Sequence, residues 1–399
     1  MASESLTQIM PLPRRAGAYT FAAIFAIESL SRSLNATVVS LQAYDIMGSS
    51  QRVSVLSASV SFAVMSSTLM IPAVLGRLRR RWAYSLGALL MLLASLMLAT
   101  HTMAGPWLGM YFRNGGAAIF NITLSLYILD HIKRQDLTRA EPIRLSLSTF
   151  SWMTGPALGV WLYVSYGPWG PQVAVILDLA LLMAVFWYIR LSDGGKVLPP
   201  GTLEPFSPLA NVRRFVSQPR LRLAWLIAFG RSCFWSTFFI YGPLLIVESG
   251  LGKGVSGVVI SASQLVLLSA YLSGRVARRY GVRKVIAGAF MLAALAALGA
   301  GLAGTHAPYV AIGLLLTGSL AASALDGVGG IPYLRAVRPH ERQRMTPVYR
   351  TYIDFSELIP SFIFAFALMW LPIGAVFVIL AGGLAIVGAI SWRYLPRSL

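Results

Sequence analysis

The chain has 399 residues, a formal net charge of +19, a charged fraction of 12% and a hydrophobic fraction of 56%. Soluble domains carry about 25% charged residues, so this composition excludes an ordinary soluble protein and indicates a membrane protein. Because the basic residues lie mainly between long apolar runs, the positive charge does not indicate a nucleic-acid partner.

Twelve apolar runs are each long enough to cross a bilayer, for which a helix needs roughly 20 residues. In chain order the predicted spans are 17–44, 53–75, 83–104, 106–131, 144–167, 171–191, 222–248, 254–275, 284–304, 307–334, 347–370 and 372–394. The hydrophilic stretch 192–221 is rich in Pro and Gly, which predicts a linker. We therefore predict an all-α polytopic membrane protein with two six-helix bundles, residues 1–191 and 222–399, joined by the linker 192–221.

The distribution of basic residues predicts the orientation. Of the 33 Lys and Arg residues, 28 lie at the chain ends and in every second connection, and only Arg52 and Lys253 lie in the other connections. Basic residues in short loops stay on the cytoplasmic side, so both termini are expected in the cytoplasm. We expect a multi-pass protein surrounded by the lipid bilayer of the plasma membrane (a bacterial inner membrane), and we expect it to be a monomer.

Short sequence pairs recur in the two halves in the same order. Arg32 is followed by Ser33 in the first span, and Arg231 is followed by Ser232 in the seventh. Gly76 follows the second span as Gly274 follows the eighth. The two members of each pair are separated by nearly the same number of residues, which predicts a duplicated unit. The two six-helix bundles are therefore expected to be pseudo-symmetric.

The loop 274–284 resembles the cytoplasmic signature of the major facilitator superfamily, which reads Gly, three residues, Asp, Arg, any residue, Gly, any residue, Arg, Lys. Arg278 replaces the Asp, and the matching positions include Gly274, Arg279, Gly281 and Arg283. The copy after the second span keeps Gly76 and Arg81, with Arg80 and Ala83 at the Asp and second Gly positions. The resemblance extends over nearly the whole chain. It implies a secondary transporter in which these residues take part in the conformational change.

The fifth span contains Gly155, Pro156 and Gly159, which resemble the Gly-Pro motif of the superfamily's antiporters. Glycines four apart allow a neighbouring helix to approach closely, and the proline permits a bend. We count these three residues with the conformational motif. The resemblance favours export over import.

Four charged residues lie on the spans that the resemblance places around a central cavity, namely spans 1, 4, 7 and 10. They are Arg32, Arg113, Arg231 and Asp326. A charge near the bilayer centre costs at least about 2.5–3.5 kcal/mol, so each needs a partner or a water-filled cavity. Arg32 and Arg231 occupy equivalent positions, and we predict that they bind an anionic group between them, because a guanidinium matches carboxylate or phosphate.

Alternative partners are available within the chain. Glu28 lies four residues before Arg32, so these two side chains could form an ion pair with a purely structural role. Arg113 could contact the substrate or pair with Asp178 of the sixth span. Further expected substrate contacts are Asn35, Trp235 and Tyr241.

Proton coupling requires a carboxylate within reach of the cavity, and Glu28 and Asp326 are the chosen candidates. In the eleventh span Arg350, Asp354 and Glu357 have helical spacing and share one face. These three residues form either a structural network near the cytoplasmic surface or part of the gate.

No metal-ligand spacing and no nucleotide-binding loop occur, so we expect no cofactor, no metal and no enzymatic activity. The preferred hypothesis is alternating-access transport of a small anionic or zwitterionic organic solute, coupled to protons or run as exchange. The first alternative is a proton-driven exporter of drugs or natural products, favoured by the Gly-Pro motif and the aromatic residues. The second is a transporter-like membrane scaffold or ligand sensor.

Overall fold

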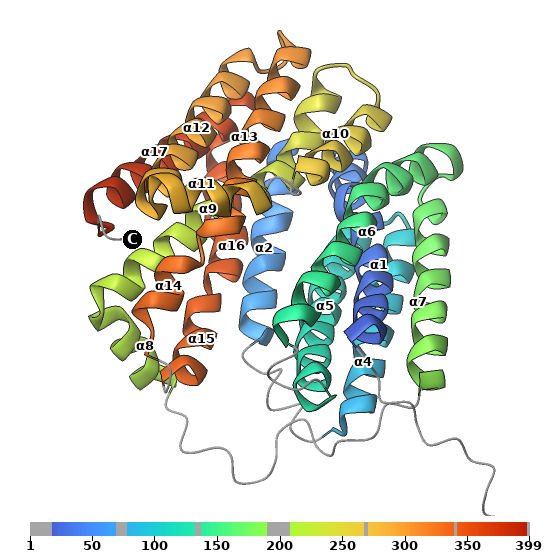
Figure 1. Ribbon diagram of the computed structural model, residues 1–399. Helices are drawn as coiled ribbons and strands as arrows, with labels where there is room; N and C mark the ends of the chain where they lie inside the picture. Colours follow the sequence, from blue (N-terminus) through green and yellow to red (C-terminus); the bar gives the residue numbers. More distant parts are fainter. Residues whose placement is uncertain are drawn as a thin grey trace, which may run out of the picture.

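The structure is a computed structural model in which the described residues form an all-helical fold, as predicted (Figure 1). It describes residues 18–68, 78–131, 137–189, 208–266, 270–338 and 341–396.

Six helices of the first bundle lie among the described residues, and they follow the predicted spans closely. They are α1 (Ala18–Met47), α2 (Ser50–Thr68), α4 (Arg80–Ala99), α5 (Ala104–His131), α6 (Leu137–Tyr166) and α7 (Trp169–Ile189). Helix α1 packs against α6 and α7, while α4 packs against α5 and α7. Buried apolar side chains such as Phe21, Tyr84 and Phe120 form the core between these helices.

The second bundle repeats this arrangement. Its helices are α9 (Pro219–Glu248), α10 (Lys253–Val266), α11 (Ala270–Tyr280), α12 (Val282–Ala303), α13 (Pro308–Val328), α14 (Ile331–Ala336), α15 (Arg342–Arg350), α16 (Tyr352–Ala367) and α17 (Gly374–Tyr394). Helix α9 packs against α16 and α17, and α12 packs against α13 and α17. The first, fifth and sixth spans thus make the contacts that the seventh, eleventh and twelfth make, as the predicted pseudo-symmetry requires.

Two predicted spans are interrupted. The tenth becomes α13 and α14, which are separated by Gly329 and Gly330, and Pro332 lies in the first turn of α14. The eleventh becomes α15 and α16, separated at Thr351.

Length and composition alone identify six candidate membrane spans among the described residues. They are Arg80–Ala99, Trp169–Ile189, Pro219–Glu248, Val282–Ala303, Pro308–Ala336 and Gly374–Tyr394. The total of twelve spans therefore stays a prediction.

The stretch predicted as a linker contains a helix that the sequence did not indicate. Helix α8 covers Pro208–Ser217, and α9 begins at Pro219, still within 192–221. Phe215 of α8 is buried against Leu221 and Tyr333, and Arg214 forms an ion pair with Glu341. Packing on the second bundle therefore stabilises α8 in a stretch rich in Pro and Gly.

The two bundles contact each other through α6 with α10 and through α2 with α16, as Figure 1 shows. Gly257 of α10 lies so close to α6 that an added Cβ would be 2.9 Å from the Cβ of Val160. The Ala157 N–H, next to Pro156, donates to the Ser261 hydroxyl at 3.0 Å. A small residue on one helix and a proline on the other thus allow close contact between the bundles.

The glycines of the Gly-Pro motif face α1 within the first bundle. An added Cβ on Gly159 would lie 1.9 Å from the carbonyl oxygen of Leu34, and one on Gly155 would lie 2.0 Å from the hydroxyl oxygen of Ser33. Glycine is therefore required at both positions by the close approach of α1, as the spacing predicted.

Candidate functional site

Four helices carry charged side chains and form one connected set of contacts, in which α1 packs on α5 and α9, and α9 packs on α13. Helices α1 and α9 contact each other across the two bundles, and they carry Arg32 and Arg231. Helices α5 and α13 add Arg113 and Asp326. None of these four side chains is fully buried.

Arg231 and Asp326 form an ion pair in the second bundle. The second oxygen of Asp326 accepts a hydrogen bond of 2.9 Å from the indole nitrogen of Trp235. The Arg231 guanidinium also donates to the hydroxyl of Tyr352 at 3.2 Å, and its carbon lies 5.7 Å from the centre of that ring. Helices α9, α13 and α16 therefore hold one guanidinium between a carboxylate and a phenol.

Arg32 forms the corresponding pair in the first bundle. Its guanidinium lies 3.6 Å from the carboxylate of Glu28, which is fully buried one helical turn earlier. Arg113 interacts electrostatically with Glu357, which reaches in from α16 of the other bundle and also interacts with Arg32. The carboxylate of Glu357, in the second bundle, therefore interacts with two arginines of the first bundle.

These pairs differ from the predicted anion clamp. Instead of sharing one anion, Arg32 and Arg231 each pair with a carboxylate of their own bundle, because Glu28 and Asp326 lie within reach. The side chains of Arg32 and Arg231 keep 24% and 22% of their surface accessible to solvent, so a ligand can reach both guanidinium groups. Arg113 does not pair with Asp178, which is buried in α7 and faces the backbone of Ser31.

Aromatic rings line the space beside the second pair. The rings of Trp235 and Phe239 lie 6.0 Å apart, and Trp152 of α6 lies 5.8 Å from Phe239. Because α6 and α9 belong to different bundles, this aromatic group spans both of them.

Two side chains that were predicted to contact the substrate are buried between helices. The amide groups of Asn35 and Gln172 exchange two hydrogen bonds of 3.1 and 3.0 Å, and both side chains are buried. Tyr241 is buried and packs edge to face on Phe364. Since neither side chain is open to a ligand in this structure, neither enters the site proposed below.

The signature residues are found at helix ends. Gly281 separates α11 from α12 with a φ of 90°, a conformation that glycine adopts readily. Gly274 and Arg279 lie on α11, and Arg283 lies on α12. In the first copy the Arg81 guanidinium lies 6.0 Å from the ring of Trp187, while Gly76 is outside the described residues.

The predicted network of the eleventh span is divided in the structure. Arg350 ends α15, and Asp354, in the first turn of α16, interacts electrostatically with it. Glu357 interacts electrostatically with Arg113 as well as with Asp354. The sequence analysis did not select Tyr352, although an aromatic residue between Arg350 and Asp354 was a usable signal.

A second polar cluster joins the bundles at their expected outer ends. The ammonium of Lys253 lies 2.6 Å from the carboxylate of Asp45, and the Tyr163 hydroxyl donates to the same oxygen at 2.6 Å. Sequence analysis missed this cluster, although Lys253 is one of only two basic residues in the predicted outer connections.

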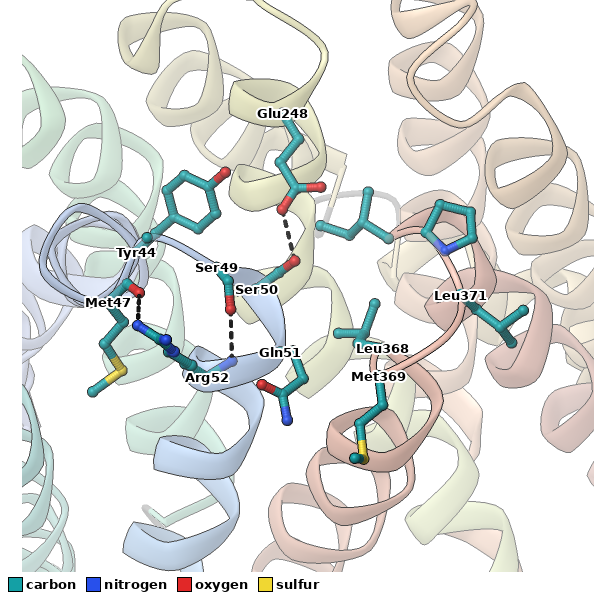
Figure 2. Close-up of a pocket in the computed structure, with 13 residues that line it drawn as sticks. Tyr44, Met47, Ser49, Ser50, Gln51, Arg52, Glu248, Leu368, Met369 and Leu371 are labelled. Carbon is teal, nitrogen blue, oxygen red and sulfur yellow. Dashed lines mark hydrogen bonds between the residues drawn. The ribbon is translucent and has the colours of Figure 1, made fainter.

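Beside this cluster, Ser50 of α2 donates to Glu248 of α9 at 2.6 Å, as Figure 2 shows. The two residues lie in the wall of a pocket of about 730 Å³ between the turn from α1 to α2 and the turn from α16 to α17. Both clusters tie together helices of different bundles on one side of the molecule.

The fold, its repeated bundles and the charged centre agree with one protein family. The family model described as Major Facilitator Superfamily matches residues 21–356. The chain belongs to the major facilitator superfamily. It is therefore an integral, multi-pass membrane protein of a transporter family, and no curated protein matches its sequence.

Solved structures of superfamily-like transporters share the fold. A POT family transporter in complex with 5-aminolevulinic acid is 13% identical, with a TM-score of 0.76 over 96% of this chain and 98% of that chain. A bacterial homologue of the iron transporter ferroportin in the inward-facing state is 13% identical, with a TM-score of 0.72 over 96% and 99%. The nucleoside transporter NupG is 16% identical, with a TM-score of 0.68 over 94% and 100%. Identities this low establish the shared fold alone.

Proposed function

We propose that this superfamily member is a secondary active transporter that moves a small zwitterionic organic solute by alternating access, coupled to protons or by exchange. The central observation is the balance of charge in the middle of the molecule. Arg32, Arg113 and Arg231 are matched there by Glu28, Asp326 and Glu357, in groups contributed by both bundles. A solute carrying both charges complements such a site better than a simple anion does.

The accessible pairs suggest how the solute binds. A carboxylate of the solute would replace Asp326 on the Arg231 guanidinium, with bidentate geometry and with Tyr352 behind it. The released Asp326 would then accept the ammonium group of the solute. Trp235 would keep the Asp326 carboxylate oriented through its indole N–H.

Proton coupling is proposed for Glu28 and Asp326. Each is held by an arginine. A solute carboxylate that takes Arg32 leaves the Glu28 carboxylate unpaired in a region of low polarity, and the Asp326 carboxylate is left unpaired whenever the bound solute carries no ammonium group. An unpaired buried charge is costly, and uptake of a proton removes that cost. Solute binding and protonation would therefore favour each other.

Alternating access is proposed to follow from the contacts between the bundles. The Asp45–Lys253 and Ser50–Glu248 contacts hold the expected outer ends together in this structure. Rocking of the two bundles around the central charges would break these contacts and expose the site to the other side. We further infer a monomer in the bacterial inner membrane with both termini in the cytoplasm, because of the distribution of basic residues.

The test uses purified protein in proteoliposomes and a panel of solutes of matched size. The panel contains a neutral amino acid, an organic monocarboxylate and an alkylamine. Wild-type protein should transport the amino acid best. Arg231→Gln and Asp326→Asn should each abolish that transport, while Arg52→Gln, whose guanidinium donates to the Met47 carbonyl of its own bundle, should preserve it.

The double variant R231Q/D326N separates binding from packing. It removes both charges, so it relieves the cost of an unpaired ion and should fold as well as the wild type. If the pair binds the solute, the double variant stays inactive. Wild-type transport by the double variant would refute the proposed site.

Export of amphipathic molecules is the second candidate function. The aromatic group of Trp152, Trp235 and Phe239 beside the charged pair favours it, since aromatic faces suit flat or cationic apolar compounds. Proton-driven export of a lipophilic cation, with no transport of the amino acid, would select this function.

A further inference from the structure

A groove lies on the outside of the second bundle, between α12 and α17. It has a volume of about 410 Å³, and its walls include Lys284, Gly288, Met291 and Trp392. All four residues are exposed, so the groove opens away from the bundle core. Figure 1 shows α12 and α17 at the side of this bundle that is remote from the first one. In a membrane this face contacts lipid.

Positive charge is concentrated at one end of the groove. Lys284 lines it, and the Arg283 guanidinium carbon lies 4.9 Å from the centre of the Trp392 ring. Within the described part of the chain neither cation has a carboxylate partner, and the Nε of Arg283 is buried without a hydrogen-bond acceptor. Among the described residues these two adjacent cations thus lack the anion that would normally accompany them.

The rest of the groove is apolar and smooth. Gly288 and Gly388 line it, and Met291 continues the wall toward the bilayer centre. An added Cβ on Gly288 would meet no atom within 4 Å, so the space beside it is open. The groove therefore combines a cationic end on the expected cytoplasmic side with an apolar channel directed into the membrane.

We infer that this groove binds an anionic phospholipid of the cytoplasmic leaflet. The lipid phosphate lies against Lys284 and Arg283, and one acyl chain lies along Gly288 and Met291. Basic pockets between helices on the cytoplasmic side suit anionic head groups, and the apolar channel selects a lipid over a soluble anion. The inference does not depend on which solute is transported.

The test measures lipid retained by the full-length protein in native mass spectrometry. Purified protein receives phosphatidylglycerol, phosphatidylcholine or inorganic phosphate. Phosphatidylglycerol should be retained in preference to phosphatidylcholine. Lys284→Gln should lower its retention about fivefold and R283Q/K284Q about thirtyfold, because each basic residue near the head group contributes independently.

A matched pair of glycine variants tests the channel. Gly288→Leu fills it and should lower phosphatidylglycerol retention as strongly as the double charge variant. Gly382→Leu, on α17, also enters open space and should have no effect.

Three results would overturn the inference. The first is equal retention of phosphatidylcholine and phosphatidylglycerol by the wild type. The second is unchanged phosphatidylglycerol retention by both G288L and R283Q/K284Q. The third is retention of inorganic phosphate as strong as that of phosphatidylglycerol. Size-exclusion profiles of the variants confirm that each is folded.

Discussion

The ammonium of Lys253 lies 2.6 Å from the Asp45 carboxylate, although the two residues come from different bundles. Tyr163 donates to the same carboxylate oxygen, so α1, α6 and α10 meet at one point. Both charged side chains remain partly exposed, which limits the contribution of the pair to about 1 kcal/mol. A contact of this strength is weak enough to break in each cycle of the proposed alternating access.

Removing Lys253 should open the expected outer side. We expect Lys253→Ala to shift the conformational equilibrium about fivefold toward the outward-open state, since about 1 kcal/mol of closing free energy is lost. Spin labels at His101 and His306, which are exposed and lie at equivalent turns of the two bundles, would report the change as a longer distance. Arg52→Ala is the control, and an equal shift in that variant would exclude a specific role for the Lys253 pair.

Glu28 should carry proton coupling without being needed for exchange. In Glu28→Gln the charge that competes for Arg32 is absent, so exchange of labelled for unlabelled solute should continue while accumulation driven by a pH gradient is lost. Glu248→Gln retains its acceptor oxygen for Ser50 and should leave both activities intact. Unchanged accumulation by E28Q would remove Glu28 from this role.

Gly159 should be intolerant of any side chain. Gly159→Ala places a methyl group against the backbone of α1 and should lower the free energy of unfolding by about 1–3 kcal/mol. Gly313→Ala, on the exposed side of α13, meets no atom within 4 Å and should be neutral or slightly stabilising. Thermal unfolding in detergent distinguishes the two, and equal melting temperatures would contradict the packing described here.

The Asn35–Gln172 pair should act on stability and not on solute affinity. Asn35→Ala leaves a buried amide without its partner and should cost about 1–2 kcal/mol of stability. Adding Gln172→Ala should cost little more, because the two groups act as one unit. Unfolding curves and the solute KM are the measurements, and a raised KM in the stable fraction of N35A would return Asn35 to the binding site.

The helices were predictable because the signals that specify a membrane span are local. Length, apolarity and loop charge placed α1, α7 and α17 within a few residues of their observed ends. Helix α8 was missed because it is short and depends on Phe215 packing onto residues far along the chain.

The partner of a charged residue could be predicted only where the two residues are close in the sequence. The Glu28–Arg32 pair follows from helical spacing, and it was considered as an alternative to the anion clamp. Asp326 is 95 residues from Arg231, and only the packing of α13 on α9 brings the two side chains together. The cross-bundle interaction of Glu357 with Arg113 has no local signal at all.

The three guanidinium and three carboxylate groups of the proposed site have an electrical consequence. In their ordinary ionised forms the six side chains sum to zero, and a zwitterion is itself neutral, so the proposed movement of a zwitterion past them carries no net charge across the membrane. Moving one elementary charge through 100 mV changes the free energy by about 2.3 kcal/mol. If the proposed proton coupling holds, the voltage dependence of transport therefore gives the number of coupled protons directly, one charge for each.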